Sequence, residues 1–309
     1  IPYAVGMDAL TEAAVQLLRR DGRLSLSEIA RRLDTTRPAV TARVSPMLES
    51  GALRILAAVH PRVLGLHSLA HLSFRVAGST APLIRRMSEL GSPVFISETV
   101  GPFEVAAEVH TRDRRELQAT MRALRSAEGV VDMQLAIYEQ VLNSFFLGAE
   151  PDNEQQLDSA DLALISELQR DGRLGYAELA AASGLSITGA RGRVQRMLEL
   201  GIMRIGAVGQ RSDSSRNLVF GLGVTLHDEG DEVIELISAR PGLEFLARTY
   251  GRFDLIATVP FASFDDFQAL VDVLRDLDGV RAVDTWLHAR IRQERYQFAQ
   301  QLPPAEQLR

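Results

Sequence analysis

The sequence predicts an α+β protein built from two copies of one unit, each a three-helix head followed by a β-α-β-β-α-β sandwich. Three observations predict this fold class. The 309-residue chain repeats itself with a period of 150 residues. The first 50 residues of each repeat space their apolar side chains as helices do, and the remainder changes to the alternation that is typical of strands.

The repeat is clearest where four consecutive residues recur. Residues 21–24 read Asp-Gly-Arg-Leu, and residues 171–174 read the same. Over residues 8–55, 18 of 48 positions match the residue 150 further on, without a gap. The register still holds at Gly129 and Gly279. The chain is therefore a duplication, and each copy must contain a complete structural unit.

The head of each copy begins with a helix that has recognisable ends. Asp8 and Asp158 are expected N-caps of this helix. Gly22 and Gly172 follow it, at the position where a left-handed residue commonly ends a helix. A second helix is expected at 27–33 and at 177–183, followed in each copy by a short turn.

A third helix follows the turn in each head. Thr36 and Ser186 are its expected N-caps, and Gly51 and Gly201 end it. Its apolar residues lie at i, i+4, i+7 and i+8, which indicates one buried face. They are Val40, Val44, Met47 and Leu48 in the first copy, and Ala190, Val194, Met197 and Leu198 in the second.

The rest of each copy reads as a ferredoxin-like sandwich. Strands are expected at 55–59, 68–76, 94–100, 103–110 and 130–137, and again at 205–208, 218–226, 244–250, 254–260 and 280–291. Helices are expected at 81–90, 114–126, 231–239 and 264–277. Helices cover one face of such a sheet, so the two copies can pair their other faces within the chain.

These elements divide the chain into six segments. We expect a first head at 1–60, a first sandwich at 61–147, a polar linker at 148–157, a second head at 158–210, a second sandwich at 211–295 and a flexible tail at 296–309.

Composition limits the functions that the chain can have. It has no cysteine, which excludes disulfides, thiolate metal sites and thiol catalysis. The six histidines show no metal-binding spacing, so we expect no metal, no cofactor and no catalytic residues. No apolar run is long enough to cross a membrane and no signal peptide is visible, so we expect a cytoplasmic protein. The net charge of −6 does not favour nucleic acid, although a small module can bind it regardless.

Several short motifs, in the same order in both copies, resemble the Lrp/AsnC (feast/famine) family. The second copy has Arg193-Val194 in its third helix, then Leu198-Glu199 before Gly201. Its sandwich carries Thr249-Tyr-Gly251-Arg-Phe253-Asp254, and the first copy has Glu104 at the last of these positions. The likeness covers about 8–140 and 158–292. The chain resembles a tandem member with two helix-turn-helix (winged) heads and two RAM-like sandwiches.

This resemblance implies a transcription regulator that binds specific sequences of double-stranded DNA. A helix-turn-helix lays its last helix in the major groove, where arginine suits guanine and glutamine suits adenine. The candidate DNA-binding residues lie on the open face or at the start of that helix. They are Thr36, Arg37, Thr41, Arg43, Ser45, Ser186, Thr188, Arg191, Arg193 and Gln195. For Arg43 and Arg193 two roles stay open, a phosphate contact or a brace within the head.

The two heads differ in sequence at these positions. Gly189 and Gly192 lie within the third helix of the second head, and Pro46 lies within that of the first. Each glycine costs roughly 0.8–1 kcal/mol of helix propensity relative to alanine. We therefore expect the heads to bind DNA unequally, so that the operator need not be a perfect palindrome.

The resemblance also implies that the sandwiches assemble the protein and bind a small effector such as an amino acid. A glycine lets a ligand or another backbone approach closely. The candidate residues are Thr99, Gly101, Glu104, Thr249, Gly251, Arg252 and Asp254. The same residues could instead serve only the hairpin turn. We expect a homo-oligomer with an even number of chains, and Trp286 in a packing role.

Two other functions remain as alternatives. Haem-pathway decarboxylases resemble this double architecture, but they carry a His-Asn-Tyr-x-Arg motif. Here Ser215-Arg216-Asn217-Leu218 lies in that neighbourhood, without the histidine or the tyrosine. The other alternative is a sensor or assembly protein that does not bind DNA, which burial of Arg37 or Arg191 would favour.

Overall fold

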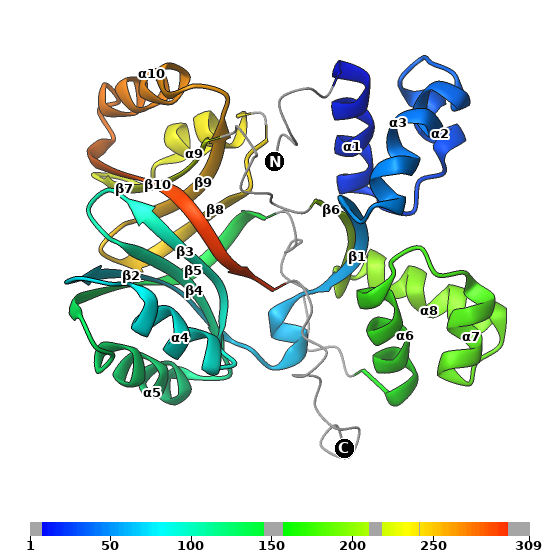
Figure 1. Ribbon diagram of the computed structural model, residues 1–309, viewed down its shortest axis with the longest axis horizontal. Helices are drawn as coiled ribbons and strands as arrows, with labels where there is room; N and C mark the ends of the chain where they lie inside the picture. Colours follow the sequence, from blue (N-terminus) through cyan, green and yellow to red (C-terminus); the bar gives the residue numbers. More distant parts are fainter. Residues whose placement is uncertain (1–7, 145–156, 210–217, 241, 296–309) are drawn as a thin grey trace. The chain divides into compact units, whose positions relative to one another are not determined.

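The computed structural model describes residues 8–144, 157–209, 218–240 and 242–295 (Figure 1). Most of the expected linker and the whole of the expected tail lie outside this range. The chain divides into two compact units. The head unit contains residues 8–64 and 157–209, and the sandwich unit contains 65–144 and the described residues of 218–295.

Each head has the three expected helices. They are α1 (Ala9–Arg20), α2 (Leu26–Arg32) and α3 (Arg37–Glu49) in the first head, and α6 (Ser159–Arg170), α7 (Tyr176–Ser183) and α8 (Ile187–Glu199) in the second. Asp8 and Asp158 accept hydrogen bonds from the backbone amides of Thr11 and Asp161, which confirms both as N-caps. A helix-turn-helix head thus stands at the start of each copy.

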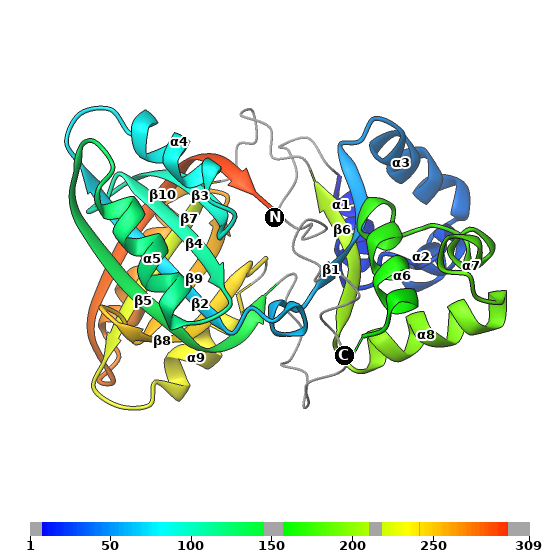
Figure 2. The same ribbon diagram turned by 90° about the horizontal axis from the view of Figure 1, so that it is seen from below.

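Two strands join the heads to each other. β1 (Leu53–Val59) runs antiparallel to β6 (Met203–Gly209), with Leu53 opposite Gly209 and Val59 opposite Met203. Both strands are almost entirely buried. Figure 2 shows the ribbon running along one side of the helices of both heads. The strands were expected from the sequence, but their pairing with each other was not, and a short 3-10 helix, η1 (Pro61–Leu64), follows β1.

The expectation of left-handed residues after the first helix of each head was wrong. Neither Gly22 nor Gly172 is among the glycines with positive φ. A Cβ added at Gly22 would lie 2.5 Å from Cγ2 of Ile55, and one at Gly172 would lie 2.7 Å from Cγ2 of Ile205. Glycine is needed here because the β1–β6 ribbon passes too close for any side chain.

The sandwich unit contains both β-α-β-β-α-β sets. The first is β2 (Ser68–Val76), α4 (Ala81–Glu89), β3 (Pro93–Val100), β4 (Val105–Thr111), α5 (Arg114–Arg125) and β5 (Val130–Ser144). The second is β7 (Leu218–Leu226), α9 (Asp231–Ser238), β8 (Phe245–Gly251), β9 (Leu255–Phe261), α10 (Phe264–Arg275) and β10 (Val280–Glu294). The α+β class and the ferredoxin-like order are confirmed.

The two sheets close into one barrel. The strand order is β10-β3-β4-β2-β5-β8-β9-β7, so each sheet pairs with the other along both edges. One seam joins β10 to β3 and the other joins β5 to β8. The sequence suggested that the two sheets pair by their uncovered faces, and it did not suggest this pairing along their edges. Inside the barrel, Trp286 packs with Phe253 and Ile256 of its own copy and with Leu69 and Ala136 of the other.

Each pair of helices covers the outside of its own sheet. Leu83 of α4 and Leu117 of α5 pack on Leu72 of β2. Val233 of α9 and Leu270 of α10 pack on the matching strand β7. The two helical layers lie on opposite sides of the barrel (Figure 1). Within the described residues no helix is both long and apolar enough to cross a membrane.

Candidate nucleic-acid interface and effector turns

The third helix of the first head has one buried face and one open face. Val40 and Val44 are fully buried in the head. The open face carries Arg37, Pro38, Thr41, Ala42 and Ser45, of which Thr41 and Ser45 are half-buried. Arg37, Pro38 and Ala42 are exposed, so the side of α3 that would enter a groove is free of protein within the head.

The third helix of the second head is arranged in the same way. Ala190, Val194 and Met197 are fully buried. The open face carries Ile187, Thr188, Arg191, Gly192 and Gln195, all of them exposed. Ile187 occupies the position that Arg37 has in the first head, and 57% of it is exposed. An isoleucine that is so exposed at the start of this helix was not foreseen as a functional residue.

The predicted cap residues stand at the N-termini of these two helices. Thr36 Oγ1 accepts a hydrogen bond from the amide of Ala39 at 3.3 Å, and Ser186 Oγ accepts one from Gly189 at 3.1 Å. Each hydroxyl keeps its own hydrogen as a donor, and a helix N-terminus favours an anion. Both side chains are exposed, so a backbone phosphate could reach them.

Arg43 and Arg193 form ion pairs within their own heads. Arg43 Nη2 lies 2.6 Å from Asp8 Oδ2, and Arg193 Nη1 lies 2.5 Å from Asp158 Oδ2. Each arginine side chain holds the pKa of its aspartate below the usual range, chiefly by a hydrogen bond. Arg193 also lies 3.1 Å from the buried carboxylate of Asp161. Of the two roles considered for these arginines, the structure shows the one that braces the third helix against the first.

The repeated Asp-Gly-Arg segments connect the heads reciprocally. Arg23 donates to the carbonyls of Gly172 and Leu174 at 3.0 and 2.9 Å. Arg173 donates to the carbonyl of Gly22 at 2.9 Å and also to that of Leu24. Burial lowers the pKa of Arg173. We call these four bonds, with the glycines that they reach, the arginine clasp.

The arginine clasp was missed because the sequence motif was interpreted only as a helix end. The signal was present, since this tetrapeptide lies within the longest identical run of the two heads, residues 20–24 and 170–174. The amide of Gly22 also donates to Ile205, and that of Gly172 donates to Ile55. The clasp and the ribbon together fix one head against the other.

A tyrosine lies beside the clasp and near one predicted DNA contact. The guanidinium carbon of Arg23 lies 4.8 Å from the centre of the Tyr176 ring, and that of Arg191 lies 5.9 Å from it. Stacking on an aromatic face is a common arrangement for arginine. Arg191 stays exposed, so this contact orients the side chain without withdrawing it from the surface.

The predicted effector residues of the first copy come together at the turn between β3 and β4. Thr99 Oγ1 donates to the carbonyl of Phe103 at 2.6 Å. Glu104 Oε2 accepts from the amide of Val76 at 2.8 Å. Both polar groups therefore already hold the turn.

The matching turn of the second copy repeats this arrangement. Thr249 Oγ1 donates to the carbonyl of Phe253 at 2.6 Å, and Asp254 Oδ2 accepts from the amide of Leu226 at 2.7 Å. Glutamate and aspartate thus fulfil the same role in the two copies. Arg252 lies 2.5 Å from Asp284 Oδ2, so the carboxylate that it contacts belongs to the protein.

The two turn glycines lie where the opposite copy passes closely. Gly101 has φ of +151°, and a Cβ added to it would lie 2.9 Å from the carbonyl oxygen of Thr285. Gly251 has φ of +142°, and its added Cβ would lie 2.2 Å from the carbonyl oxygen of Leu135. Close approach was expected at both positions, and the group that approaches is backbone from the other sandwich.

The barrel also contains polar side chains that the sequence analysis did not single out. His71 Nε2 lies 3.0 Å from Ser73 Oγ, and Trp286 Nε1 donates to His288 Nε2 at 3.2 Å. Glu108 faces the same side of the sheet, opposite His71 in the ladder, and burial raises its pKa to about 7. The available signal was the alternation of these residues with apolar ones along β2 and β4.

Models of known families match both heads and the second sandwich. The AsnC-type helix-turn-helix domain matches residues 157–198, and the Lrp/AsnC ligand binding domain matches 218–297. A winged helix-turn-helix DNA-binding domain matches residues 7–54. The chain belongs to the Lrp/AsnC family. In this Lrp/AsnC chain, the matched helix-turn-helix segments include α3 and α8 with their open faces.

Relatives of this Lrp/AsnC chain match one copy at a time. The HTH-type transcriptional regulator FL11 of Pyrococcus furiosus is 25% identical over 126 residues, which are 40% of this chain and 83% of the relative. The HTH-type transcriptional regulator LysM of Sulfurisphaera tokodaii is 19% identical over 135 residues, which are 44% and 96%. A single-copy regulator therefore corresponds to about half of this chain.

A solved structure matches both copies together. The siroheme decarboxylase NirDL has a TM-score of 0.65 and 14% identity, and the match covers 97% of both chains. At this identity the likeness concerns the fold. The tandem arrangement of two heads and two sandwiches therefore also occurs in a protein with a different name and reaction.

Proposed function

We propose that this Lrp/AsnC chain is a cytoplasmic transcription regulator that binds specific sequences of duplex DNA with both of its heads. The observation that carries the proposal is the pair of open helix faces on α3 and α8, on heads that the arginine clasp and the β1–β6 ribbon fix together. Dimeric helix-turn-helix proteins present two recognition helices to successive major grooves. In this chain, one polypeptide supplies both.

The side chains on these faces suit particular contacts. Arg37 and Arg191 would donate to guanine, and Gln195 would pair with adenine. Thr41, Ser45 and Thr188 lie on the same faces, where hydroxyls can bond to bases or phosphates. Thr36 and Ser186 would hold phosphates at the helix N-termini. Arg43 and Arg193 would support the interface indirectly, by holding the third helix in place.

A binding measurement tests this proposal. A labelled duplex from upstream of the chain's own gene should bind with a slope of log K against log salt of about −0.9 per phosphate contact. Arg37→Ala and Arg191→Ala should each weaken binding by about 1–3 kcal/mol at the cognate site and relax selectivity there. Arg20→Ala, at an exposed position of α1, is the matched control. Binding that is weak and indifferent to sequence would contradict the proposal.

We also propose that the sandwiches bind a small effector, such as an amino acid, near the turns that contain Gly101 and Gly251. The family model for this region is described as a ligand binding domain, which supports the proposal. Because Thr99, Glu104, Thr249 and Asp254 already bond within their turns, an effector would have to add to these bonds or exchange with them. Arg252 would similarly have to leave Asp284 to contact a ligand carboxylate. A thermal-shift screen of amino acids would detect binding, since a ligand specific to the native state raises its stability.

The fold likeness to a siroheme decarboxylase makes that reaction worth testing. The segment that would carry the decarboxylase motif, residues 215–217, lies outside the described residues. We expect no release of carbon dioxide when the purified chain is incubated with siroheme. Turnover that depends on the protein concentration would favour the enzyme instead of the regulator.

A further inference from the structure

The outer helices of the two sandwiches carry opposite charge. α4 and α5, on the first sandwich, contain six arginines and two glutamates, which gives a net charge of +4. α9 and α10, on the second, contain six carboxylates and one arginine, which gives −5. All six of those arginines and all six of those carboxylates are exposed. We call the surface of α4 and α5 the basic face and the surface of α9 and α10 the acidic face.

The difference arises at matching positions of the duplication. Three arginines of the basic face are replaced by acids exactly one period further on, so the sign of the charge is inverted there. The pairs are Arg85 with Glu235, Arg115 with Asp265, and Arg122 with Asp272. A general bias of composition would have changed both faces alike.

Most of the basic face has no internal counter-charge. Arg86 lies 3.2 Å from Glu89. The other five arginines of the face have no hydrogen-bond or ion-pair partner among the described residues; they are Arg85, Arg114, Arg115, Arg122 and Arg125. Their charges are therefore available to an external partner.

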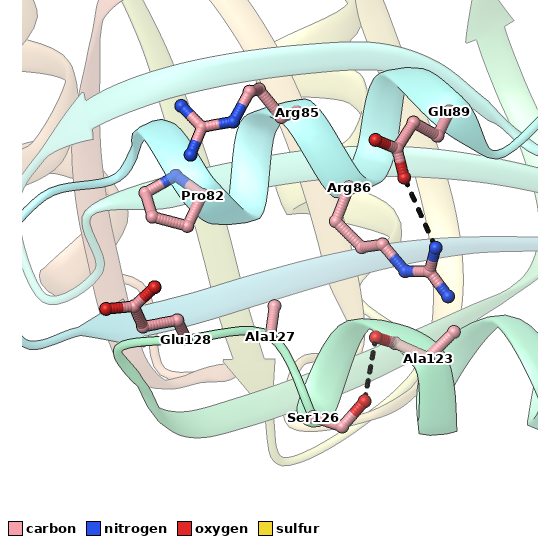
Figure 3. Close-up of a pocket in the computed structure, with 8 residues that line it drawn as sticks. All are labelled: Pro82, Arg85, Arg86, Glu89, Ala123, Ser126, Ala127 and Glu128. Atoms are coloured by element: carbon pink, nitrogen blue, oxygen red, sulfur yellow. Dashed lines mark hydrogen bonds and ion pairs between the residues drawn. The ribbon is translucent and has the colours of Figure 1, made fainter.

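The two faces also differ in shape. A hollow of about 270 Å³ lies between α4 and α5. Figure 3 shows Arg85, Arg86, Ala123 and Ala127 among the residues that line it. On the acidic face the positions that match Ala123 and Ala127 are occupied by Val273 and Leu277. Val273 is 48% exposed, so an apolar side chain projects where the basic face is hollowed.

The two faces lie on opposite sides of the barrel, so they cannot neutralise each other within one chain (Figure 1). We propose that the basic face of one chain docks on the acidic face of a second copy, with Val273 of the second copy entering the hollow between α4 and α5. DNA would also be attracted to the basic face. A DNA contact, however, would leave the matching acidic face and the exposed Val273 unexplained.

This contact is heterologous, since it joins two different surfaces. Each added chain leaves one basic and one acidic face free, so assembly continues until a ring closes or a filament grows. Because exposed charges provide the complementarity, the association weakens as salt shortens the range of their attraction. It does not require DNA, so it can be measured independently of the proposed regulatory function.

Sedimentation velocity of the full chain without DNA tests the contact. Association is expected at about 0.05 M salt and should be largely lost at about 0.5 M, where screening extends over only a few ångströms. Arg85→Glu/Arg122→Glu lowers the charge of the basic face to zero, and Glu235→Arg/Asp272→Arg reduces that of the acidic face to −1. Each double variant alone should be monomeric, while Arg20→Glu, outside both faces, should associate like the original chain.

Mixing the two double variants distinguishes this contact from a symmetric one. Each variant keeps one intact face, so the mixture should form a complex of two chains that grows no further. Val273→Asp should weaken the association of the full chain at least tenfold, even though it makes the acidic face more negative. A chain that is monomeric at all salt concentrations would overturn the proposal, as would a mixture that fails to pair or a Val273→Asp variant that associates normally. Loss of DNA binding by Arg85→Glu/Arg122→Glu with unchanged self-association would instead assign the basic face to nucleic acid.

Discussion

The structure leaves no room for a side chain larger than a hydrogen atom at Gly22 and Gly172. The side chain of Ile55 and the backbone of Gly206 surround the site at Gly22, and neither is the end of a flexible chain. Gly22→Ala should therefore lower the free energy of unfolding by about 1–3 kcal/mol, as overpacking does elsewhere. Urea unfolding followed by circular dichroism would measure the change.

Gly192 provides the control for this substitution. It also lies in a head, within α8, but a Cβ added to it would meet nothing within 4 Å. Gly192→Ala should raise the free energy of unfolding by about 0.8–1 kcal/mol, the usual helix preference for alanine. Equal effects of the two substitutions would mean that the close passage of the ribbon is not what selects glycine.

Glu108 should make the stability of the sandwich unit depend on pH. Its pKa is about 7 in the folded protein and near 4.5 when exposed, so the folded state binds a proton more strongly. Its contribution to stability is complete below pH 4.5 and is lost as the pH rises through 7. Glu108→Gln should remove this loss, which is up to about 3 kcal/mol.

The free energy of unfolding of the original chain and of the Glu108→Gln variant would be measured at pH 5, 6, 7 and 8. The two values should diverge as the pH rises, by about one kcal/mol or more for each unit of pKa shift. His71 faces Glu108 and acts in the opposite sense. Burial lowers the pKa of His71 to about 4. Its contribution to stability is therefore complete above pH 6.5 and is lost as the pH falls through 4. Parallel pH profiles of the two proteins between pH 5 and 8 would show that the carboxyl is not held in its neutral form.

The third helices of the two heads differ in the chemistry of their first residue. Arg37 can donate two hydrogen bonds to guanine, whereas Ile187 can contact only the methyl group of thymine. The two half-sites of the operator are therefore expected to differ at the corresponding base pair. Ile187→Arg should shift the preference of the second half-site toward guanine by about 1–3 kcal/mol.

Selection of binding sites from a random duplex library would show the two half-sites directly. The original chain should yield unlike half-sites, and Ile187→Arg should yield a more symmetric operator. Two identical half-sites for the original chain would contradict the expected inequality of the heads.

The helices and strands could be predicted from the sequence because the signals that define them are local. Asp8 and Asp158 show their capping role within four residues, and Val40 with Val44 show the buried face of α3 within two turns. The gapless repeat confirmed each assignment a second time. The misinterpretation of Gly22 has the same origin, since its neighbour Ile55 is far away in the sequence.

The candidate sites were predictable to different extents for the same reason. Open positions such as Arg37 follow from the period of a single helix. The arginine clasp and the seams of the barrel depend on which strands pair, and nothing within β1 or β5 alone specifies its partner. The roles of Glu104 and Asp254 also depend on distant amides, which only the folded sheet brings within reach.

The two copies are interlocked throughout the molecule. Within the head unit they share the β1–β6 ribbon and the arginine clasp, and within the sandwich unit they share both seams of the barrel. Each copy alone would expose the edges of its sheet, which are prone to aggregation. The covalent connection between the copies should therefore be dispensable once the chain has folded.

Cleavage between the copies tests this conclusion. A protease site placed within residues 148–156 should give two fragments that still elute together on gel filtration, because the paired strands of the seams and of the ribbon hold them without the linker. Gly251→Ala should weaken this association after cleavage, since its Cβ would lie 2.2 Å from the carbonyl oxygen of Leu135 across a seam. Gly192→Ala, away from every seam, should leave it unchanged. Fragments that separate as soon as the linker is cut would show that the tether, and not the shared barrel and ribbon, keeps the two copies together.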